Sequence, residues 1–293
     1  MTEAFSSALP VRLKTWGSFV KFSHTVFALP FALGMGVVCS KTTNVSIGQI
    51  LWIVWCVIAA RTSAMAFNRI ADQKWDALNP RTSNRELPSG AIKRNEALLL
   101  WFLAGIGFLF GSWQLGSHCF ILAPIVLAIV CGYSLIKRFS RFSHFFLGFA
   151  LACAPGGVWF ALIGSLTYEP LVLMAAVLFW VAGFDIIYSC QDAQFDRSVG
   201  LFSIPSAMGI GSALRIARIA HVISWVLLII FGMAAELHSP YYILMGVFGV
   251  FLLRQNMIIH EKTLHRADNV FFTQNGLASI TFLIATLVES LLS

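Results

Sequence analysis

Apolar and polar stretches alternate along this chain with the spacing of helices that cross a bilayer. Nine apolar runs cover residues 19–40, 48–70, 95–116, 117–136, 144–164, 169–191, 214–235, 241–259 and 271–291. About 20 apolar residues in a helix span the hydrocarbon core of a membrane. Gly, Pro, Ser and charged residues fill the breaks, as in short membrane loops. The pattern predicts an all-α, polytopic membrane bundle of about nine transmembrane helices, with residues 1–293 forming one integral-membrane domain.

Composition supports this interpretation and excludes other classes. The chain has 293 residues, of which 58% are hydrophobic and 11% are charged, whereas a soluble domain carries about 25% charged residues. The abundance of apolar residues also excludes a disordered chain. The six cysteines fall inside apolar runs and form no CxxC pair, so we interpret them as small apolar side chains.

The basic residues predict the orientation in the membrane. The net charge is +7, and the Lys and Arg residues gather before the first run and after every even-numbered run, with Lys41 alone in an opposite connection. Cytoplasmic loops accumulate such bases. We therefore expect a multi-pass protein of the bacterial inner (cell) membrane, with a cytoplasmic N-terminus and a C-terminus outside. Since topology accounts for the charge, we expect no nucleic-acid partner, and no protein partner is predicted.

The acidic residues point to a site. Six of the thirteen Asp and Glu residues lie in two short windows, residues 67–90 and 184–209. The first window lies at the end of the second run and the second window at the end of the sixth run. The two runs are therefore four helices apart along the chain. This predicts two four-helix pseudo-repeats plus one terminal helix, with both acidic windows facing each other across one cavity.

The spacing within the windows suggests metal chemistry. Asn68, Asp72 and Asp76 are four residues apart and therefore share one helix face. Asp192 and Asp196 repeat this spacing after Tyr188, and Asp185 lies about one turn before that tyrosine. Converging carboxylates repel one another unless cations neutralise them. Mg²⁺ binds one or two carboxylates together with phosphate oxygens, so the pattern predicts a diphosphate held by Mg²⁺.

Two other interpretations are open at this point. The aspartates could cap helix ends and solvate loops, although two copies at the same spacing favour a shared site. They could also form the gate of an ion or metabolite transporter, but transport sites lie near the middle of the bilayer, and these acids lie at one interface.

The motifs resemble those of a known family. Residues 68–90, NRIADQKWDALNPRTSNRELPSG, are similar to the first signature of the UbiA superfamily of intramembrane aromatic prenyltransferases. Residues 188–196, YSCQDAQFD, resemble the second signature. The resemblance implies a helical bundle around a central cavity, with the aspartates under cytoplasmic cap loops and a lipid-facing opening for an isoprenoid tail.

The resemblance also implies an activity. Mg²⁺ would hold a polyprenyl diphosphate, and an aromatic ring would attack the allylic cation that forms when the diphosphate leaves. The metal ligands would be Asn68, Asp72, Asp76, Asp192 and Asp196, and the four aspartates would be catalytic. The segments look most like 4-hydroxybenzoate polyprenyltransferases, so 4-hydroxybenzoate is the expected acceptor in respiratory quinone biosynthesis. The alternative acceptor is a dihydroxynaphthoate, as in the futalosine branch of menaquinone synthesis.

Further side chains are candidates for substrate binding. Lys137 and Arg138 follow the fourth run, and Arg61 lies within the second run. Arg85 belongs to the first cap loop, within the first signature, and Lys21 begins the first run. Tyr188 and Asp185 belong to the second window. Arg138 is the stronger candidate of the neighbouring pair. His24, His144 and His221 have no metal-ligand spacing, and we interpret them as structural.

Overall fold

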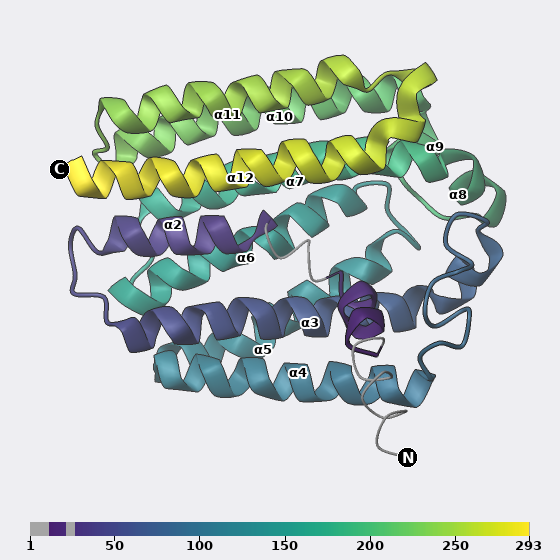
Figure 1. Ribbon diagram of the computed structural model, residues 1–293, viewed down its shortest axis with the longest axis horizontal. Helices are drawn as coiled ribbons and strands as arrows, with labels where there is room; N and C mark the ends of the chain where they lie inside the picture. The colour runs from purple at the N-terminus through teal and green to yellow at the C-terminus, as the bar shows by residue number, and fades with distance from the viewer. Residues whose placement is uncertain (1–11, 22–26, 293) are drawn as a thin grey trace, which may run out of the picture.

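The computed structural model describes residues 12–21 and 27–292, and all regular structure within these residues is helical. Figure 1 shows long helices lying side by side in one bundle. The elements are α2 (Leu29–Cys39), α3 (Ile47–Leu78), α4 (Arg94–Leu115), α5 (Ser117–Ile136), α6 (Ser143–Ile163), α7 (Tyr168–Ser189), η2 (Cys190–Asp192), α8 (Ala193–Val199), α9 (Ile204–Met208), α10 (Ile210–Ala234), α11 (Ser239–Ile258), η3 (Glu261–Arg266) and α12 (Ala267–Leu292).

Among the described residues, eight helical segments are long and apolar enough to cross a membrane. The predicted count of nine is not confirmed, because the first apolar run does not form one continuous described helix. Residues 12–19 are helical, and Lys21 follows in a turn with a positive φ of 49°. Helix α2 begins with Pro30 in its first turn, where a proline fits because its missing N–H needs no partner. At 11 residues, α2 is about 16 Å long, short of a bilayer core.

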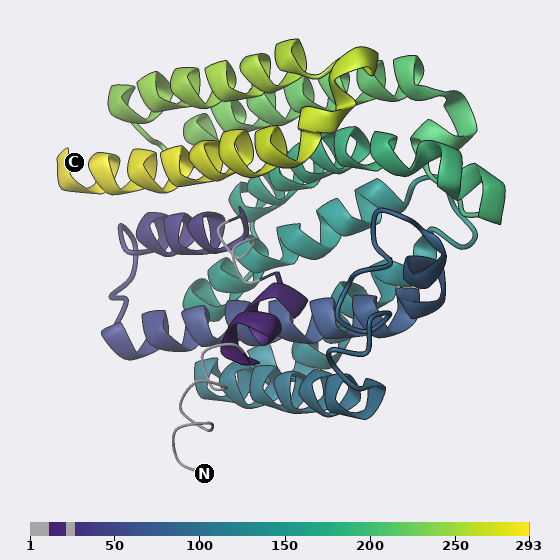
Figure 2. The ribbon, with the colours of Figure 1, turned by 45° about the vertical axis from the view of Figure 1, so that its right-hand side comes forward.

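Successive long helices alternate in direction, so the bundle has two distinct ends. The first cap loop (residues 79–93) and the second cap segment (residues 190–209) lie at the same end, opposite the C-terminus (Figures 1 and 2). We call this the cap end. The prediction that both acidic windows lie at one end of the bundle is therefore confirmed.

Each long helix of the bundle packs against two or more others. Helices α3, α4 and α5 pack against one another, while α7 packs against α6 and α10, and α10 against α11. Helix α12 closes the bundle against α11 and α2. Glycines allow close approaches between helices: a Cβ at Gly148 would collide with the carbonyl of Leu178, and one at Gly183 would collide with the ring of His221. Small residues at such crossings are typical of membrane helices.

Helix α3 carries the first window beyond the apolar part of the bundle. Its N-terminus is fixed by a capping box between Ser46 and Gln49, and it ends at Asn79, just before Pro80. A residue before proline disfavours helical backbone, so the helix stops there. The 32 residues of α3 extend about 48 Å, more than the core of a bilayer requires. The surplus carries Asp72 and Asp76 toward the cap end.

Candidate active site

A cavity of about 260 Å³ lies at the cap end, between α3, α7 and the two cap segments. Residues of both acidic windows line it, so the predicted meeting of the windows is confirmed. All but one of the site residues predicted from the sequence border this cavity, namely Asn68, Asp72, Asp76, Asp192, Asp196, Asp185, Tyr188, Lys137, Arg85, Arg61 and Lys21.

The α3 side of the cavity holds three oxygen-bearing side chains on one face. Asn68 Nδ2 donates to Asp72 Oδ2 at 3.3 Å and to Ser134 Oγ at 3.2 Å. Lys137 Nζ forms an ion pair with Asp72 Oδ2 at 2.8 Å. The other oxygen, Asp72 Oδ1, is buried and has no hydrogen-bond partner within the described part of the chain. A buried carboxylate oxygen without a donor is costly, so this atom is available to a ligand.

The first cap loop folds back over α3. Arg85 Nη1 donates to both oxygens of Asp76, at 2.7 and 2.9 Å, and Thr82 Oγ1 donates to the backbone carbonyl of the same aspartate at 3.1 Å. The sequence predicts Arg85 as a candidate for substrate binding. The structure places it over the cavity, with its guanidinium held by Asp76.

The second window departs from the continuous helical face that its spacing suggests. Tyr188 lies at the end of α7, Asp192 ends the 3₁₀ turn η2, and Asp196 belongs to the short helix α8. A 3₁₀ turn is tighter than an α-helical turn, so it redirects the chain between Tyr188 and Asp192. Both carboxylates still border the cavity.

Arg81 joins the two windows, and sequence reasoning did not select it. Its Nε donates to Asp192 Oδ1 at 2.9 Å, its Nη2 pairs with Asp192 Oδ2, and its Nη1 donates to the Tyr188 hydroxyl at 2.9 Å. Burial alone would lower the pKa of Arg81, but the contacts with Asp192 and Tyr188 raise it above the ordinary arginine value. The signal in the sequence was its place in the first signature, directly after Pro80.

His144 is the second residue whose place in the site was not predicted. Its Nδ1 lies 2.7 Å from Asp185 Oδ2, and its Nε2 accepts a hydrogen bond from the backbone N–H of Ile204 at 3.3 Å. The ring is 2% exposed and borders the cavity. His144 therefore connects α6, α7 and the second cap segment. His24 lies outside the described residues, and His221 is buried against Asn256, away from the cavity.

Lys137 and Arg138, the two adjacent bases after α5, have different contacts. Lys137 faces Asp72; burial would lower the pKa of Lys137, but the ion pair raises it above the ordinary lysine value. Arg138 donates to the carbonyl of Ala71 at 2.8 Å and lies over the ring of Trp75, with its Cζ 4.6 Å from the ring centroid. Arg138 is not among the residues that line the cavity.

Two further bases border the cavity without an ion pair among the described residues. Burial lowers the pKa of Lys21, with Arg69 and Arg85 adding to the effect. Arg61, on α3, has a buried Nε without a hydrogen-bond partner in the described chain. Both therefore offer positive charge to a ligand in the cavity.

A second cavity of about 290 Å³ lies next to the first, deeper in the bundle. Its walls come mostly from α3, α4, α5 and α6, and they are almost entirely apolar. Arg61, Tyr133 and Leu151 border both cavities. The two spaces therefore lie next to each other, the charged one at the cap end and the apolar one within the bundle.

The carboxylate oxygens of the cavity suit a metal ion that is also coordinated by a bound substrate. Among the described residues, no three His, Cys, Asp or Glu side chains converge closely enough to hold a metal alone. Mg²⁺ needs only one or two carboxylates when phosphate oxygens and water complete its octahedron. The unpartnered Asp72 Oδ1 and the carboxylate pair on each side of the cavity meet this requirement.

Comparison with known proteins agrees with the geometry. Residues 28–277 match the UbiA prenyltransferase family. A 4-hydroxybenzoate octaprenyltransferase of Sodalis glossinidius is 30% identical over 280 residues, covering 95% of this chain and 92% of that protein. One of Haemophilus ducreyi is 24% identical over 262 residues, covering 89% and 91%.

Solved structures share the fold. The apo structure of a UbiA homolog from Aeropyrum pernix K1 has a TM-score of 0.81 at 31% identity, covering 90% of this chain and 97% of that one. A UbiA homolog from Archaeoglobus fulgidus bound to GPP and Mg²⁺ has a TM-score of 0.72 at 19% identity, covering 94% and 98%. With a family match over most of its length and, among the described residues, eight helical segments long and apolar enough to span a membrane, this chain belongs to the UbiA prenyltransferase family and is a multi-pass membrane prenyltransferase.

Proposed function

We propose that this enzyme transfers a polyprenyl group from polyprenyl diphosphate to a ring carbon of 4-hydroxybenzoate, in respiratory quinone biosynthesis. The observation that carries the proposal is that a charged cavity and an apolar cavity lie side by side, with Arg61 and Tyr133 bordering both. A charged chamber next to an apolar one suits a substrate with an anionic head and a long apolar tail. The names of the curated relatives support 4-hydroxybenzoate as the acceptor.

The charged chamber would hold the diphosphate. Arg81, Arg85 and Lys137 now pair with aspartates around the chamber, and a diphosphate would give these cations a second anionic partner. Mg²⁺ would be held by Asn68 and the four aspartates of the two windows, and it would supply positive charge to the leaving diphosphate. The nearby Lys and Arg side chains favour the same charge development, since they are already fixed in place before the reaction.

The reaction breaks the C1–O bond of the polyprenyl diphosphate, and the electron pair leaves with the diphosphate. A ring carbon of the acceptor then forms a bond to C1 of the allylic cation, and the ring loses a proton. The cation must be kept from water. The apolar walls and the Tyr133 side chain lie where the chambers meet, so they would exclude water and offer an aromatic face to the cation.

We further propose that the cap end is cytoplasmic, that the N-terminus is inside and that the C-terminus is outside a bacterial cell membrane. The support is the charge asymmetry of the connections, in which Lys41 is the one base expected on the opposite side. Reporter fusions within residues 75–92 and 197–212 should report the cytoplasm, and a fusion at the C-terminus should not. A cytoplasmic C-terminus would contradict this orientation.

The acceptor is tested by an assay on membranes that contain this protein. Radiolabelled polyprenyl diphosphate is offered with 4-hydroxybenzoate or with a dihydroxynaphthoate, and the labelled products are separated. The expected result is a prenylated 4-hydroxybenzoate. A product formed only with dihydroxynaphthoate would overturn the acceptor while keeping the reaction, and no product with either would overturn both.

A further inference from the structure

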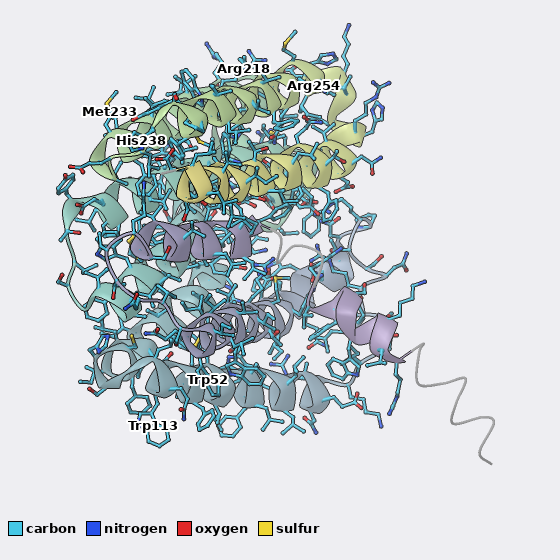
Figure 3. All side chains as sticks on the ribbon, turned by 60° about the vertical axis from the view of Figure 1, so that its left-hand side comes forward. Trp52, Trp113, Arg218, Met233, His238 and Arg254 are labelled. Atoms are coloured by element: carbon cyan, nitrogen blue, oxygen red, sulfur yellow. The ribbon has the colours of Figure 1, made fainter. Side chains whose placement is uncertain are left out.

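Two exposed arginines interrupt the outward face of the α10–α11 pair. Arg218 lies on α10 and Arg254 on α11, and both are exposed (Figure 3). The other exposed side chains of this face are mainly large and apolar, as expected for contact with lipid, and include Ile219, Val222, Val226, Ile230, Val247, Val250, Leu253 and Met257. The two guanidinium groups therefore belong to a surface that is otherwise suited to acyl chains.

The packing of the pair places these arginines at similar heights. The helices are antiparallel, and Trp225 Nε1 donates to the carbonyl of Met245 at 2.8 Å. From this contact toward the cap end, Arg218 is seven residues along α10 and Arg254 is nine residues along α11. At about 1.5 Å per residue, their heights differ by about 3 Å. Arg215, also exposed, lies one turn nearer the cap end than Arg218.

These arginines lack the acidic partners that Arg81, Arg85 and Lys137 have at the reaction chamber. Within the described chain, none of the three forms an ion pair; Arg215 donates only to the Ser212 hydroxyl, at 3.2 Å. The carboxylate of Glu261 lies beside Gly211 at the start of α10, but it pairs with none of them.

An arginine on a lipid-facing helix surface is costly unless its charge reaches the interface or an anion. Arg254 is four residues from the end of α11, about 6 Å along the helix, so a long side chain can extend to the level of the headgroups. Guanidinium groups bind phosphate through two parallel hydrogen bonds. Two such groups at heights that differ by about 3 Å, with a third about one turn nearer the cap end, suit the phosphate of one lipid.

We propose that Arg215, Arg218 and Arg254 form a binding site for the phosphate headgroup of an anionic phospholipid at the cap end of α10 and α11. The site is separate from the reaction chamber, since no residue of α10 or α11 lines either cavity. Its occupant is a membrane lipid, because the apolar side chains below the arginines continue along the path of the acyl chains.

The test measures lipid binding by the purified full-length protein. Native mass spectrometry in mixed micelles compares phosphatidylglycerol with phosphatidylcholine, and the unfolding temperature is followed in parallel. Wild-type protein should prefer phosphatidylglycerol, and the double variant Arg218→Gln/Arg254→Gln should lose at least about tenfold of that affinity. Arg141→Gln, which removes an exposed base from another loop of the cap end, should keep the wild-type preference.

A second double variant, Arg218→Lys/Arg254→Lys, keeps both charges and loses the planar, two-pronged geometry. We expect normal folding and an affinity between those of the wild type and the Gln variant. The proposal is overturned if wild-type protein shows no preference for phosphatidylglycerol. It is also overturned if both double variants retain the wild-type affinity, which would place the lipid elsewhere, for example in the reaction chamber.

Discussion

Arg81 of the first cap loop and Asp192 of the second cap segment form an ion pair across 111 residues of sequence, with a 2.9 Å hydrogen bond from Nε to Oδ1. Asn79 adds a second donor to the same carboxylate oxygen at 2.9 Å. This pairing ties the two cap segments together over the cavity. It also holds the Arg81 guanidinium beside the aspartates without a metal ion. A diphosphate that enters the cavity would therefore compete with Asp192 for this guanidinium.

Arg81→Gln should weaken substrate binding, because the diphosphate loses a cation and the cap segments lose their connection. We expect KM for the polyprenyl diphosphate to rise by about tenfold, the scale of one charge-assisted hydrogen bond. Steady-state kinetics in membranes measures this effect. Lys74→Gln removes an exposed base of the same helix end outside the cavity and should leave KM unchanged. If the Arg81→Gln and Lys74→Gln variants have equal KM values, Arg81 takes no part in substrate binding.

The two acidic windows should each be required for turnover. We propose that Asp72 and Asp76 hold one metal and that Asp192 and Asp196 hold a second, with the diphosphate between them. Replacing any of the four by Asn removes a negative charge at nearly constant volume. Turnover should fall by at least about 10²-fold, the typical scale of lost transition-state electrostatics. Asp185→Asn should have a smaller effect, since Asp185 contacts His144.

These variants also separate the shared site from simple helix capping. Each variant is first checked for normal expression and for its unfolding temperature. If Asp72→Asn is inactive while Asp192→Asn and Asp196→Asn keep wild-type turnover, the second window caps its helices and the two-metal arrangement is wrong.

Lys137 and Arg138 should differ in what they support. The sequence favoured Arg138 for substrate binding, whereas the structure places Lys137 on Asp72 and Arg138 over Trp75. Lys137→Ala should raise KM or lower kcat by tenfold or more, on the order of one charge-assisted contact. Arg138→Ala should mainly lower stability, by about 0.5–1 kcal/mol for the lost cation–π contact. Kinetics and thermal unfolding of both variants decide the assignment; a large KM effect of Arg138→Ala alone would restore the sequence-based choice.

The apolar cavity should set the length of tail that the enzyme accepts. A Cβ at Gly157 on α6 would meet nothing within 4 Å, and Gly157 borders this cavity. Gly157→Leu should therefore place its side chain in this cavity and reduce kcat/KM for long polyprenyl diphosphates by about tenfold or more, the scale of about two lost buried methylenes. Dimethylallyl diphosphate, which has no long tail, should be affected much less.

Gly246→Leu on α11 is the matched control, since its Cβ position is also open and lies outside both cavities. This variant should leave the preference for tail length unchanged. If Gly157→Leu reduces the rate with short and long substrates equally, the apolar cavity does not hold the tail.

Local spacing predicted the parts of the site that depend on one helix. Asn68, Asp72 and Asp76 share a face of α3 because residues four apart always do, and the repeat of the acidic windows correctly brought Asp192 to the same cavity. The 3₁₀ turn before Ala193 was not visible, because the spacing of Tyr188, Asp192 and Asp196 is the same with or without it. Hydropathy likewise could not show that α2, within the first apolar run, would be only 11 residues long.

The partners of the site residues depended on tertiary structure. His144 meets Asp185 across 41 residues and Ile204 across 60, and no pattern around SHFF encodes either contact. The choice between Lys137 and Arg138 rests on which side chain faces inward where α5 ends, and adjacent residues at a helix end cannot be separated by periodicity. Arg81 was within the recognised motif, but its pairing with Asp192 required both cap segments in place.

The most direct test of the central claim is the metal dependence of product formation by the purified protein in lipid vesicles. Labelled polyprenyl diphosphate and 4-hydroxybenzoate are supplied, and the prenylated acid is quantified with Mg²⁺, after EDTA, and after Mg²⁺ is restored. The aspartates cannot hold a diphosphate without cations, so product should form with Mg²⁺, vanish with EDTA and return when Mg²⁺ is added back. Full product formation in metal-free vesicles would contradict the account.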